Sequence, residues 1–376
     1  MRGRAAVPVL TTAAMTASML PLFLVGALSP ALVREFGIAR PLLGVLVTAG
    51  FGVAVVLSLA IGPVVDALGP RRSIIVLFAS SAVALTVFAA APHYAVLVLA
   101  VGLGGVPQAL ANPSTNKLIA GSVEAARRPV LLGIKQSGVQ LGAFVAGLPL
   151  AWLADGVDWR LAVGVAAGLA LVAGLGCMAL PQDPIPARRV SLLEVARRPL
   201  LTVTLGASRL IWRLAGFSLL LGSGIAAVNT YVALYATEEL GFGAPVAAGL
   251  VAVLGVVGIA GRIVWSRVAG RELLVGLSAA AVLAPLLLLT GVPALAWVAM
   301  VVVGGCAVAA NAISMVLVVA ASQGAELGRN SALVSAGFFA GFAVGPPLFG
   351  LVGYGAGWVL VAVEFGLAAV VAWRAR

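Results

Sequence analysis

The sequence has little charge, one histidine and two cysteines, and each shortage excludes a class of protein. Asp, Glu, Lys and Arg make up 9% of the 376 residues, against about 25% in an average soluble protein. One histidine, His93, and two cysteines, Cys177 and Cys306, are too few for zinc, haem or serine–histidine chemistry. Both cysteines lie in apolar stretches, where a free thiol behaves as a small hydrophobic group. We therefore expect no metal site, no cofactor and no disulfide framework.

Apolar residues are abundant instead, at 62% of the chain, which is more than a water-soluble fold can hide. A helix that crosses a bilayer needs about 20 apolar residues. Twelve stretches qualify: 9–33, 42–65, 73–91, 95–116, 130–153, 161–180, 214–237, 245–265, 273–290, 293–321, 330–352 and 356–373. The sequence therefore predicts an all-α integral membrane protein with twelve transmembrane helices.

Basic residues are distributed unequally about these spans. If the N-terminus lies inside, 19 of the 23 basic residues fall in cytoplasmic segments or at cytoplasmic span ends, and only Arg34, Arg40 and Arg160 lie outside. This asymmetry follows the positive-inside rule. It predicts a multi-pass protein of the bacterial cytoplasmic (inner) membrane, with both termini in the cytosol. The net charge of +11 then faces anionic lipid headgroups, so we expect no nucleic-acid partner. We also expect the protein to be a monomer in the lipid bilayer.

The two halves of the chain repeat each other. A shift of 199 residues aligns Asn112 with Asn311, Gly138 with Gly337, Gly142 with Gly341, and Trp159 with Trp358. Six spans in each half keep the same orientation, so the repeat is parallel, with a pseudo-twofold axis along the membrane normal. We predict an N-terminal six-helix bundle over residues 1–180 and a C-terminal one over 214–376. The cytoplasmic linker between them, 181–213, includes residues 190–213, which fit either an amphipathic interfacial helix or a solvated segment.

A short motif lies between spans two and three, where residues 62–72 read GPVVDALGPRR. Gly62 allows close helix approach and Gly69 a tight turn. Asp66 can accept charge-assisted hydrogen bonds from a neighbouring arginine, such as Arg71 or Arg72, or from a helix N-terminus. Such a cluster can latch the cytoplasmic side shut in one state and release it in another. An ordinary positive-inside turn is the alternative interpretation.

This motif, the span count and the internal repeat resemble the major facilitator superfamily over the whole chain. The resemblance implies two six-helix bundles, alternating access and a central cavity lined by spans one, four, seven and ten. The Gly-Pro pair of drug antiporters in span five is missing here. Many proton-coupled members also carry an acidic residue in span one and an arginine early in span four. Both are missing, so we do not expect proton coupling through that arrangement.

Spans five and eleven carry residues suited to close helix packing. Spaced glycines let helix backbones approach each other in lipid. The candidates are Gly138 and Gly142 in span five and Gly337 and Gly341 in span eleven. Span eleven also holds Pro346, beside Pro347, and this pair is expected to kink the helix.

Polar residues inside the spans are the candidate substrate contacts. They are Gln108 and Asn112 in span four, Lys135, Gln136 and Gln140 in span five, Asn229 in span seven and Asn311 in span ten. Asn112 and Asn311 are repeat mates, and the pseudo-twofold axis would place them opposite each other across the cavity. Lys135 fits either an anion contact or a lysine that snorkels to the headgroups. Glu364, in the middle of span twelve, fits pairing with a neighbour or protonation in lipid.

These features predict a secondary active transporter that moves a small solute across the cytoplasmic membrane, with a small organic anion as the favoured substrate. Efflux of drugs or metabolites is the alternative within this fold, and a non-transporting sensor or a membrane enzyme is the alternative outside it. No GxxxxGK[ST] loop for ATP is present. We expect the partners to be a small-molecule substrate, the bilayer and, if transport is coupled, an ion.

Overall fold

The computed structural model describes residues 2–58, 60–124, 127–180, 207–265, 268, 270–322 and 326–375. Every regular element in these ranges is a helix, which agrees with the all-α prediction. The segment 181–206, which holds most of the predicted linker, lies outside the described residues. The two interpretations of residues 190–213 are therefore not distinguished over that part.

In the described part of the N-terminal half, ten α-helical segments and two short helical turns of other types have defined bounds. They are α1 (Arg2–Ala27), α2 (Ser29–Phe36), α3 (Arg40–Ser58), α4 (Ile61–Leu68), α5 (Pro70–Ala89), α6 (Tyr94–Leu103), α7 (Gly105–Ser122), α8 (Arg128–Val145), the π-helical turn η2 (Ala146–Leu150), α9 (Ala151–Gly156), α10 (Trp159–Gly176) and the 3-10 turn η3 (Cys177–Ala179).

The C-terminal half continues with α12 (Arg209–Glu238), α13 (Ala244–Trp265), α14 (Arg271–Ala281), α15 (Leu283–Leu289), α16 (Pro293–Val302), the π-helical turn η6 (Val303–Val308), α17 (Ala309–Ala320) and α18 (Glu326–Arg374). Helix α12 begins at Arg209, five residues before the predicted start of the C-terminal bundle at 214, because Ser208 caps its N-terminus by accepting a hydrogen bond from the Ile211 amide.

Among the described residues, eleven helical stretches are long and apolar enough to cross a membrane. The last, 330–374, is two spans in one continuous assignment, because Gly353 adopts φ 77° and breaks the helical backbone there. The predicted twelve spans are therefore present. Two spans end well before their predicted limits. Span two, predicted over 42–65, ends at Ser58, and α4 starts separately at Ile61. Span one is predicted over 9–33. Helix α1 ends at Ala27, and α2 starts separately with Pro30 in its first turn, where a missing amide donor costs nothing.

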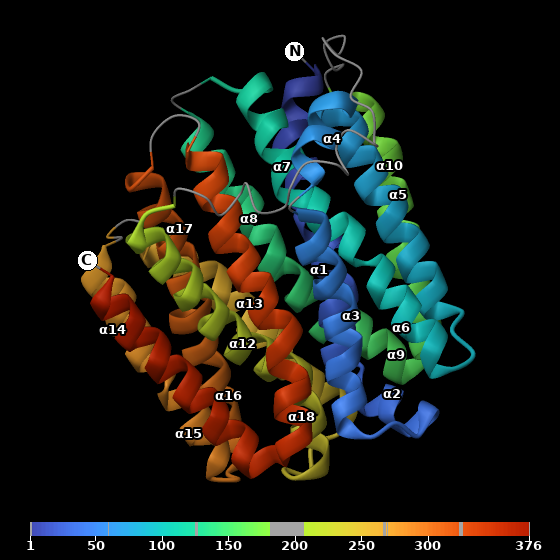
Figure 1. Ribbon diagram of the computed structural model, residues 1–376. Helices are drawn as coiled ribbons and strands as arrows, with labels where there is room; N and C mark the ends of the chain where they lie inside the picture. The colour runs from blue at the N-terminus through green and yellow to red at the C-terminus, as the bar shows by residue number, and fades with distance from the viewer. Residues whose placement is uncertain are drawn as a thin grey trace.

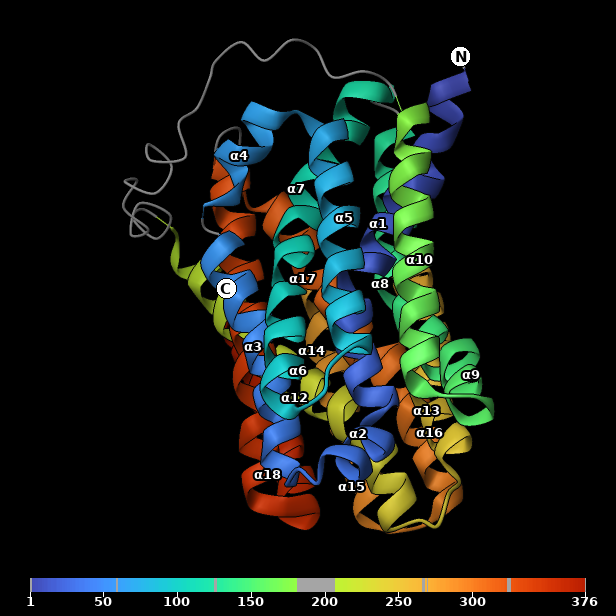
Figure 2. The ribbon, with the colours of Figure 1, turned by 90° about the vertical axis from the view of Figure 1, so that its right-hand side faces the viewer.

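The two halves lie side by side, with the N-terminal half in blue to green and the C-terminal half in yellow to red (Figures 1 and 2). We call the end where α1 begins the inner end, since it is predicted to face the cytosol, and the opposite end the outer end. Spans are joined at the outer end by tight turns, including one at Gly241 and one at Gly291, both with positive φ.

The predicted packing glycines make equivalent contacts in the two halves. A Cβ atom on Gly138 of α8 would lie 2.3 Å from the carbonyl oxygen of Thr12 in α1, and one on Gly337 of α18 would lie 2.4 Å from that of Ala215 in α12. The next pair follows one turn later: Gly142 approaches Thr16, and Gly341 approaches Leu219. Both helix pairs are thus related by the internal repeat, with partner positions 203 residues apart.

The Pro346–Pro347 pair does not interrupt α18. The only residue with non-helical dihedrals inside this helix is Gly353. The prolines instead present their backbone to the other half of the molecule, where Gly44 of α3 packs against them.

Candidate substrate site

The halves are held together most closely at the outer end. A Cβ atom on Gly26 of α1 would lie 2.0 Å from the carbonyl oxygen of Asn229 in α12, and one on Gly44 would lie 2.4 Å from the Pro347 nitrogen. The hydroxyl of Tyr231 lies 2.9 Å from the carbonyl oxygens of both Arg40 and Pro346. The chain therefore adopts an arrangement in which the outer end is closed.

A charged cluster, which we call the outer latch, covers this closure and consists of Arg40, Glu238 and Tyr354. The Nε and Nη2 atoms of Arg40 donate to Oε2 of Glu238 at 3.0 and 2.7 Å, and the Tyr354 hydroxyl donates to the same oxygen at 2.7 Å. The Arg40 guanidinium also lies 4.1 Å from the centre of the Tyr354 ring. One residue comes from the N-terminal half and two from the C-terminal half. The latch therefore spans the interface between the halves, which we call the seam.

The inner end has no matching contact between spans four and ten in the part of the chain that the structure describes. Their inner segments, α7 and α17, make at most minor contact with each other, and Figure 1 shows α17 to the left of α7, which lies near the middle of the view. Asn116 on α7 and Val316 on α17 are exposed.

Lys135 of α8 is buried inside the N-terminal half, with 2% of its surface exposed. Its Nζ atom donates to Oδ1 of Asn112 at 2.9 Å and to Oγ1 of Thr115 at 3.0 Å, both on α7. No carboxylate of the described residues lies within 4 Å of this ammonium. A snorkelling lysine would reach the headgroups instead, so the described position is that of a buried cation with neutral partners.

Asn112 and Asn311, the predicted facing pair, are both half-buried but do not form a hydrogen bond with each other in this state. Oδ1 of Asn112 accepts a hydrogen bond from Nζ of Lys135, and the backbone carbonyl of Asn311 accepts one from the Ser314 hydroxyl. Their contact across the cavity stays a prediction for a state in which α7 and α17 are closer.

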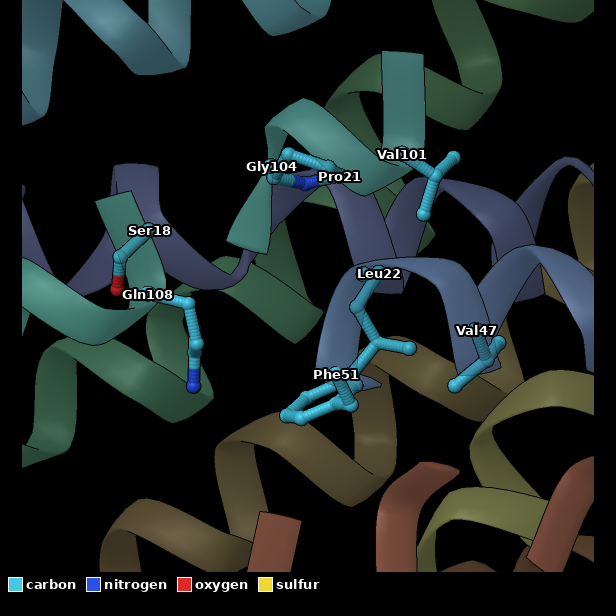
Figure 3. Close-up of a pocket in the computed structure, with 9 residues that line it drawn as sticks. Ser18, Pro21, Leu22, Val47, Phe51, Val101, Gly104 and Gln108 are labelled. Carbon is cyan, nitrogen blue, oxygen red and sulfur yellow. The ribbon is translucent and has the colours of Figure 1, made fainter. Parts of the chain in front are cut away.

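Gln108 lies one turn from Asn112 and lines a small cavity between α1, α3, α6 and α7 (Figure 3). The cavity has a volume of about 20 Å³, which accommodates about one water molecule. Ser18 and Gln108 are its polar side chains, and Phe51 closes one side. It is too small for an organic solute in this state.

Gln136 and Gln140, which the sequence places with Lys135, face a different neighbour. Both lie where α8 meets α13 of the other half. The carbonyl oxygen of Gln136 accepts a hydrogen bond from Nη1 of Arg262 at 3.2 Å, and the Gln140 side chain packs against Gly258. Oε1 of Gln140 and Nε of Arg262 are both buried without a hydrogen-bond partner.

Asn229 belongs to the outer closure. Its side chain is 2% exposed, and its amide donates to Ile225 of the same helix at 3.0 Å. Its Oδ1 atom has no hydrogen-bond partner, and its backbone carbonyl packs closely against Gly26 of α1. The predicted substrate residues therefore fall into separate places: Lys135 with Asn112, Gln136 with Gln140, and Gln108, Asn229 and Asn311 each in its own setting.

The inner motif pairs within its own half. Asp66 of α4 accepts a hydrogen bond from Lys117 of α7 at 2.6 Å, where the sequence analysis named an arginine or a helix N-terminus as donor. Gly69 has φ 82° and forms the predicted turn. Arg71 donates to the carbonyl oxygens of Cys177 and Met178, and Arg72 follows it on α5. Among the described residues, no neighbouring helix comes within 4 Å of a Cβ position on Gly62, so the close approach expected there is not made in this state.

The sequence did not reveal four residues of these sites: Thr115, Arg262, and Glu238 and Tyr354 of the outer latch. Thr115 follows Asn112 by three residues and so shares its helix face, a spacing that could have revealed it. Arg262 was counted as a charge at a cytoplasmic span end. Its orientation toward α8 depends on the packing of the two halves, which no local pattern encodes.

The chain is similar in sequence to known membrane transporters. A model of the Major Facilitator Superfamily matches residues 10–323. A gallate transporter from Pseudomonas putida is 27% identical over 145 residues, which cover 38% of this chain and 32% of that transporter. The match thus spans less than two thirds of the length of this relative.

Two solved structures share the fold. A bacterial homologue of the human lysosomal transporter Spinster, in an inward-facing and occupied conformation, superposes with a TM-score of 0.76 at 15% identity and covers 100% of this chain and 97% of its own. The nucleoside transporter NupG gives a TM-score of 0.75 at 15% identity, with 98% and 99% covered. These likenesses confirm the predicted architecture.

Proposed function

The chain belongs to the major facilitator superfamily, and on that premise we propose that it is a secondary active transporter of a small organic anion. It alternates between an outer-closed arrangement, the one described above, and an inner-closed one. In this proposal it works as a monomer in the bacterial cytoplasmic membrane, with both termini in the cytosol. The N-terminal bundle covers residues 1–180 and the C-terminal bundle 214–376, and they move against each other.

The observation that carries the substrate class is the buried ammonium of Lys135. Its partners, Asn112 and Thr115, are neutral, and no carboxylate balances it among the described residues. A buried charge without a counter-charge costs several kcal/mol. An anion that reaches α7 and α8 would supply the missing charge, whereas a cation would be repelled.

Arg262 supports the same sign of charge from the other half. It reaches α8 one residue along from Lys135, by donating to the carbonyl of Gln136, and its buried Nε–H has no acceptor. A carboxylate accepts hydrogen bonds from guanidinium and ammonium groups strongly. The two cations thus flank the same turn of α8 from the two halves of the molecule.

The relative adds a candidate within this class. The Pseudomonas putida relative is a gallate transporter, and gallate is a small organic anion. Aromatic carboxylates are therefore the first probes, with aliphatic carboxylates and organic cations as comparisons.

The test is uptake of labelled gallate and benzoate into proteoliposomes by the parent, Lys135→Gln and Lys135→Arg. Loss of one charge-assisted hydrogen bond is worth about 1.5–3 kcal/mol, so we expect Lys135→Gln to weaken binding by about tenfold or more. Lys135→Arg keeps the charge and should retain part of the activity.

Arg209→Gln is the matched control, because Arg209 is an exposed cation at the inner end of α12. It should transport like the parent. Equal transport by the parent and both Lys135 variants would remove the main support for an anionic substrate. Binding of cations in preference to carboxylates by the parent would contradict it directly.

A further inference from the structure

One acidic side chain lies in the membrane interior of the C-terminal half and takes no part in the substrate site. Glu364, in the second span of α18, is 7% exposed. Its Oε1 atom accepts a hydrogen bond from the hydroxyl of Ser223 in α12 at 2.5 Å. Its Oε2 atom is buried without a partner. Ionisable groups at membrane depth are costly, and those that persist commonly serve ion or proton movement.

No positive charge balances Glu364 in the described structure. The helices that pack against α18 near it are α12, α14 and α15, and α15 carries no titratable group. Those on the other two are Arg209, Arg213, Tyr231, Tyr235 and Glu238 of α12 and Arg271 and Glu272 of α14. None of them hydrogen-bonds or pairs with Glu364. Arg213 and Arg271 instead bind carbonyl groups at residues 372–374, about two turns or more along the helix.

The fold itself does not require a polar pair at this position. The repeat relates α12 to α1 by 203 residues and the second span of α18 to α10 by 199, so the counterparts of Ser223 and Glu364 are Leu20 and Val165. In the N-terminal half both positions carry apolar side chains: Leu20 is buried, and Val165 is 40% exposed. A carboxylate buried with a single hydroxyl partner is thus an addition to the C-terminal half, made at a cost in free energy.

The pair adjoins the contacts that close the outer end. Ser223 fits against glycines of the other span of α18: a Cβ on Gly345 would lie 2.5 Å from the Ser223 hydroxyl oxygen. The next residue, Pro346, is part of the contact with Gly44 of the other half. Asn229, which meets Gly26, lies six residues along α12 from Ser223, or about 9 Å. A change at Glu364 therefore acts on both helices that form the seam.

We propose that Glu364 and Ser223 form a proton-binding site that couples proton movement to the transport cycle. The coupling, but not the site, rests on the proposed function. A proton from water on the outer side adds to the ionised carboxylate and gives a neutral carboxyl group. This group holds the proton through the outer-closed state and returns it to water on the inner side. One positive charge then crosses with each monoanion, so the pair moves without net charge.

Two measurements test this site, in the parent, Glu364→Gln and Glu272→Gln. Glu272 is an exposed acid of the same half and serves as the matched control. The first is infrared difference spectroscopy of protein in nanodiscs at neutral pH. It should show the band of a protonated carboxyl group in the parent and Glu272→Gln, and not in Glu364→Gln. The second is proton uptake into proteoliposomes driven by a gallate gradient, followed with an internal pH dye.

We expect gallate-driven proton uptake to fall to the background level in Glu364→Gln. Exchange of labelled for unlabelled gallate, which moves no net proton, should persist and show that the variant is folded. Ser223→Ala should keep the infrared band but shift it. A parent without the band overturns the site, and so does coupled proton uptake by Glu364→Gln. If the parent exchanges no gallate or benzoate, the proposed substrate class fails, and the infrared result still decides whether Glu364 binds a proton.

Discussion

Asp66 shows how one residue can have different partners in different states. Its carboxylate pairs here with Lys117 of the same half, and the Asp66 and Lys117 side chains are 69% and 40% exposed. Such a pair contributes about 0–1 kcal/mol, so its loss alone shifts a population at most about fivefold. A latch in the inner-closed state would add a second contact that the outer-closed state does not contain.

We therefore expect Asp66→Asn to slow transport more than Lys117→Gln does, because only the first removes the contacts of both states. The measurement is initial uptake rate in proteoliposomes, normalised to inserted protein. Asp155→Asn, at an exposed acid of the outer end, is the control and should transport like the parent. If Asp66→Asn and Lys117→Gln slow transport equally, Asp66 has no second partner in the inner-closed state, and the latch is contradicted.

At the residue scale, hydropathy and spacing correctly placed Lys135 inside span five and the polar residues Gln108 and Asn112 inside span four. The contact between Lys135 and Asn112 was not predicted, and neither were Thr115 and Arg262 as partners of α8. The reason is physical: a local pattern fixes the helix face on which a residue lies, whereas the neighbour of that face is set by packing between helices distant in sequence.

Helix pairing within each half depends on glycines at the crossing points. At Gly341 a Cβ atom would lie 2.1 Å from the carbonyl oxygen of Leu219 and 2.7 Å from the amide nitrogen of Ser223. Both are backbone atoms of α12 and cannot rotate away. Overpacking of this kind costs about 1–3 kcal/mol.

Gly341→Ala should therefore lower the unfolding temperature of the purified protein in detergent, because α18 must move away from α12. Gly168→Ala is the matched control, since nothing lies within 4 Å of its Cβ position in α10. This change should leave the unfolding temperature unchanged or raise it slightly, because alanine favours the helix over glycine. A control that lowers it as much as Gly341→Ala would show that crossing-point contact is not the cause.

At the element scale, apolar length located all twelve spans, and most ends agree within a few residues. The ends that differ depend on single residues, such as Pro30 in the first turn of α2 and Ser208 as the cap of α12. An average of hydropathy over a span does not include such local effects. Gly353 has the opposite effect: it breaks the backbone so briefly that two spans share one helix assignment.

The whole molecule is two similar bundles whose relative position is set at the outer latch. The repeat in the sequence predicted the two halves and their parallel relation, but it could not predict which end is closed. That choice depends on contacts such as Arg40 with Glu238, a partly exposed ion pair whose loss costs about 0.2–1 kcal/mol. A sequence specifies both states of a transporter, and the structure shows one.

Glu238→Gln should weaken the latch, because it removes the charge that Arg40 and Tyr354 share through one oxygen. We expect a larger fraction of molecules with the outer end open, by up to about fivefold for a difference of about 1 kcal/mol. Glu239→Gln is the control. Glu239 lies 4.0 Å from the Arg40 guanidinium, so its loss should have a smaller effect.

The most direct test of alternating access measures both ends of the seam in the same protein, by double electron–electron resonance between spin labels in a background without Cys177 and Cys306. One pair of labels replaces Ala39 and Thr290 at the outer end, and a second pair replaces Gly121 and Ala321 at the inner end. All four positions are exposed. The account predicts that Glu238→Gln lengthens the outer distance and shortens the inner one. Distances that stay fixed, or that change in the same direction at both ends, would contradict it.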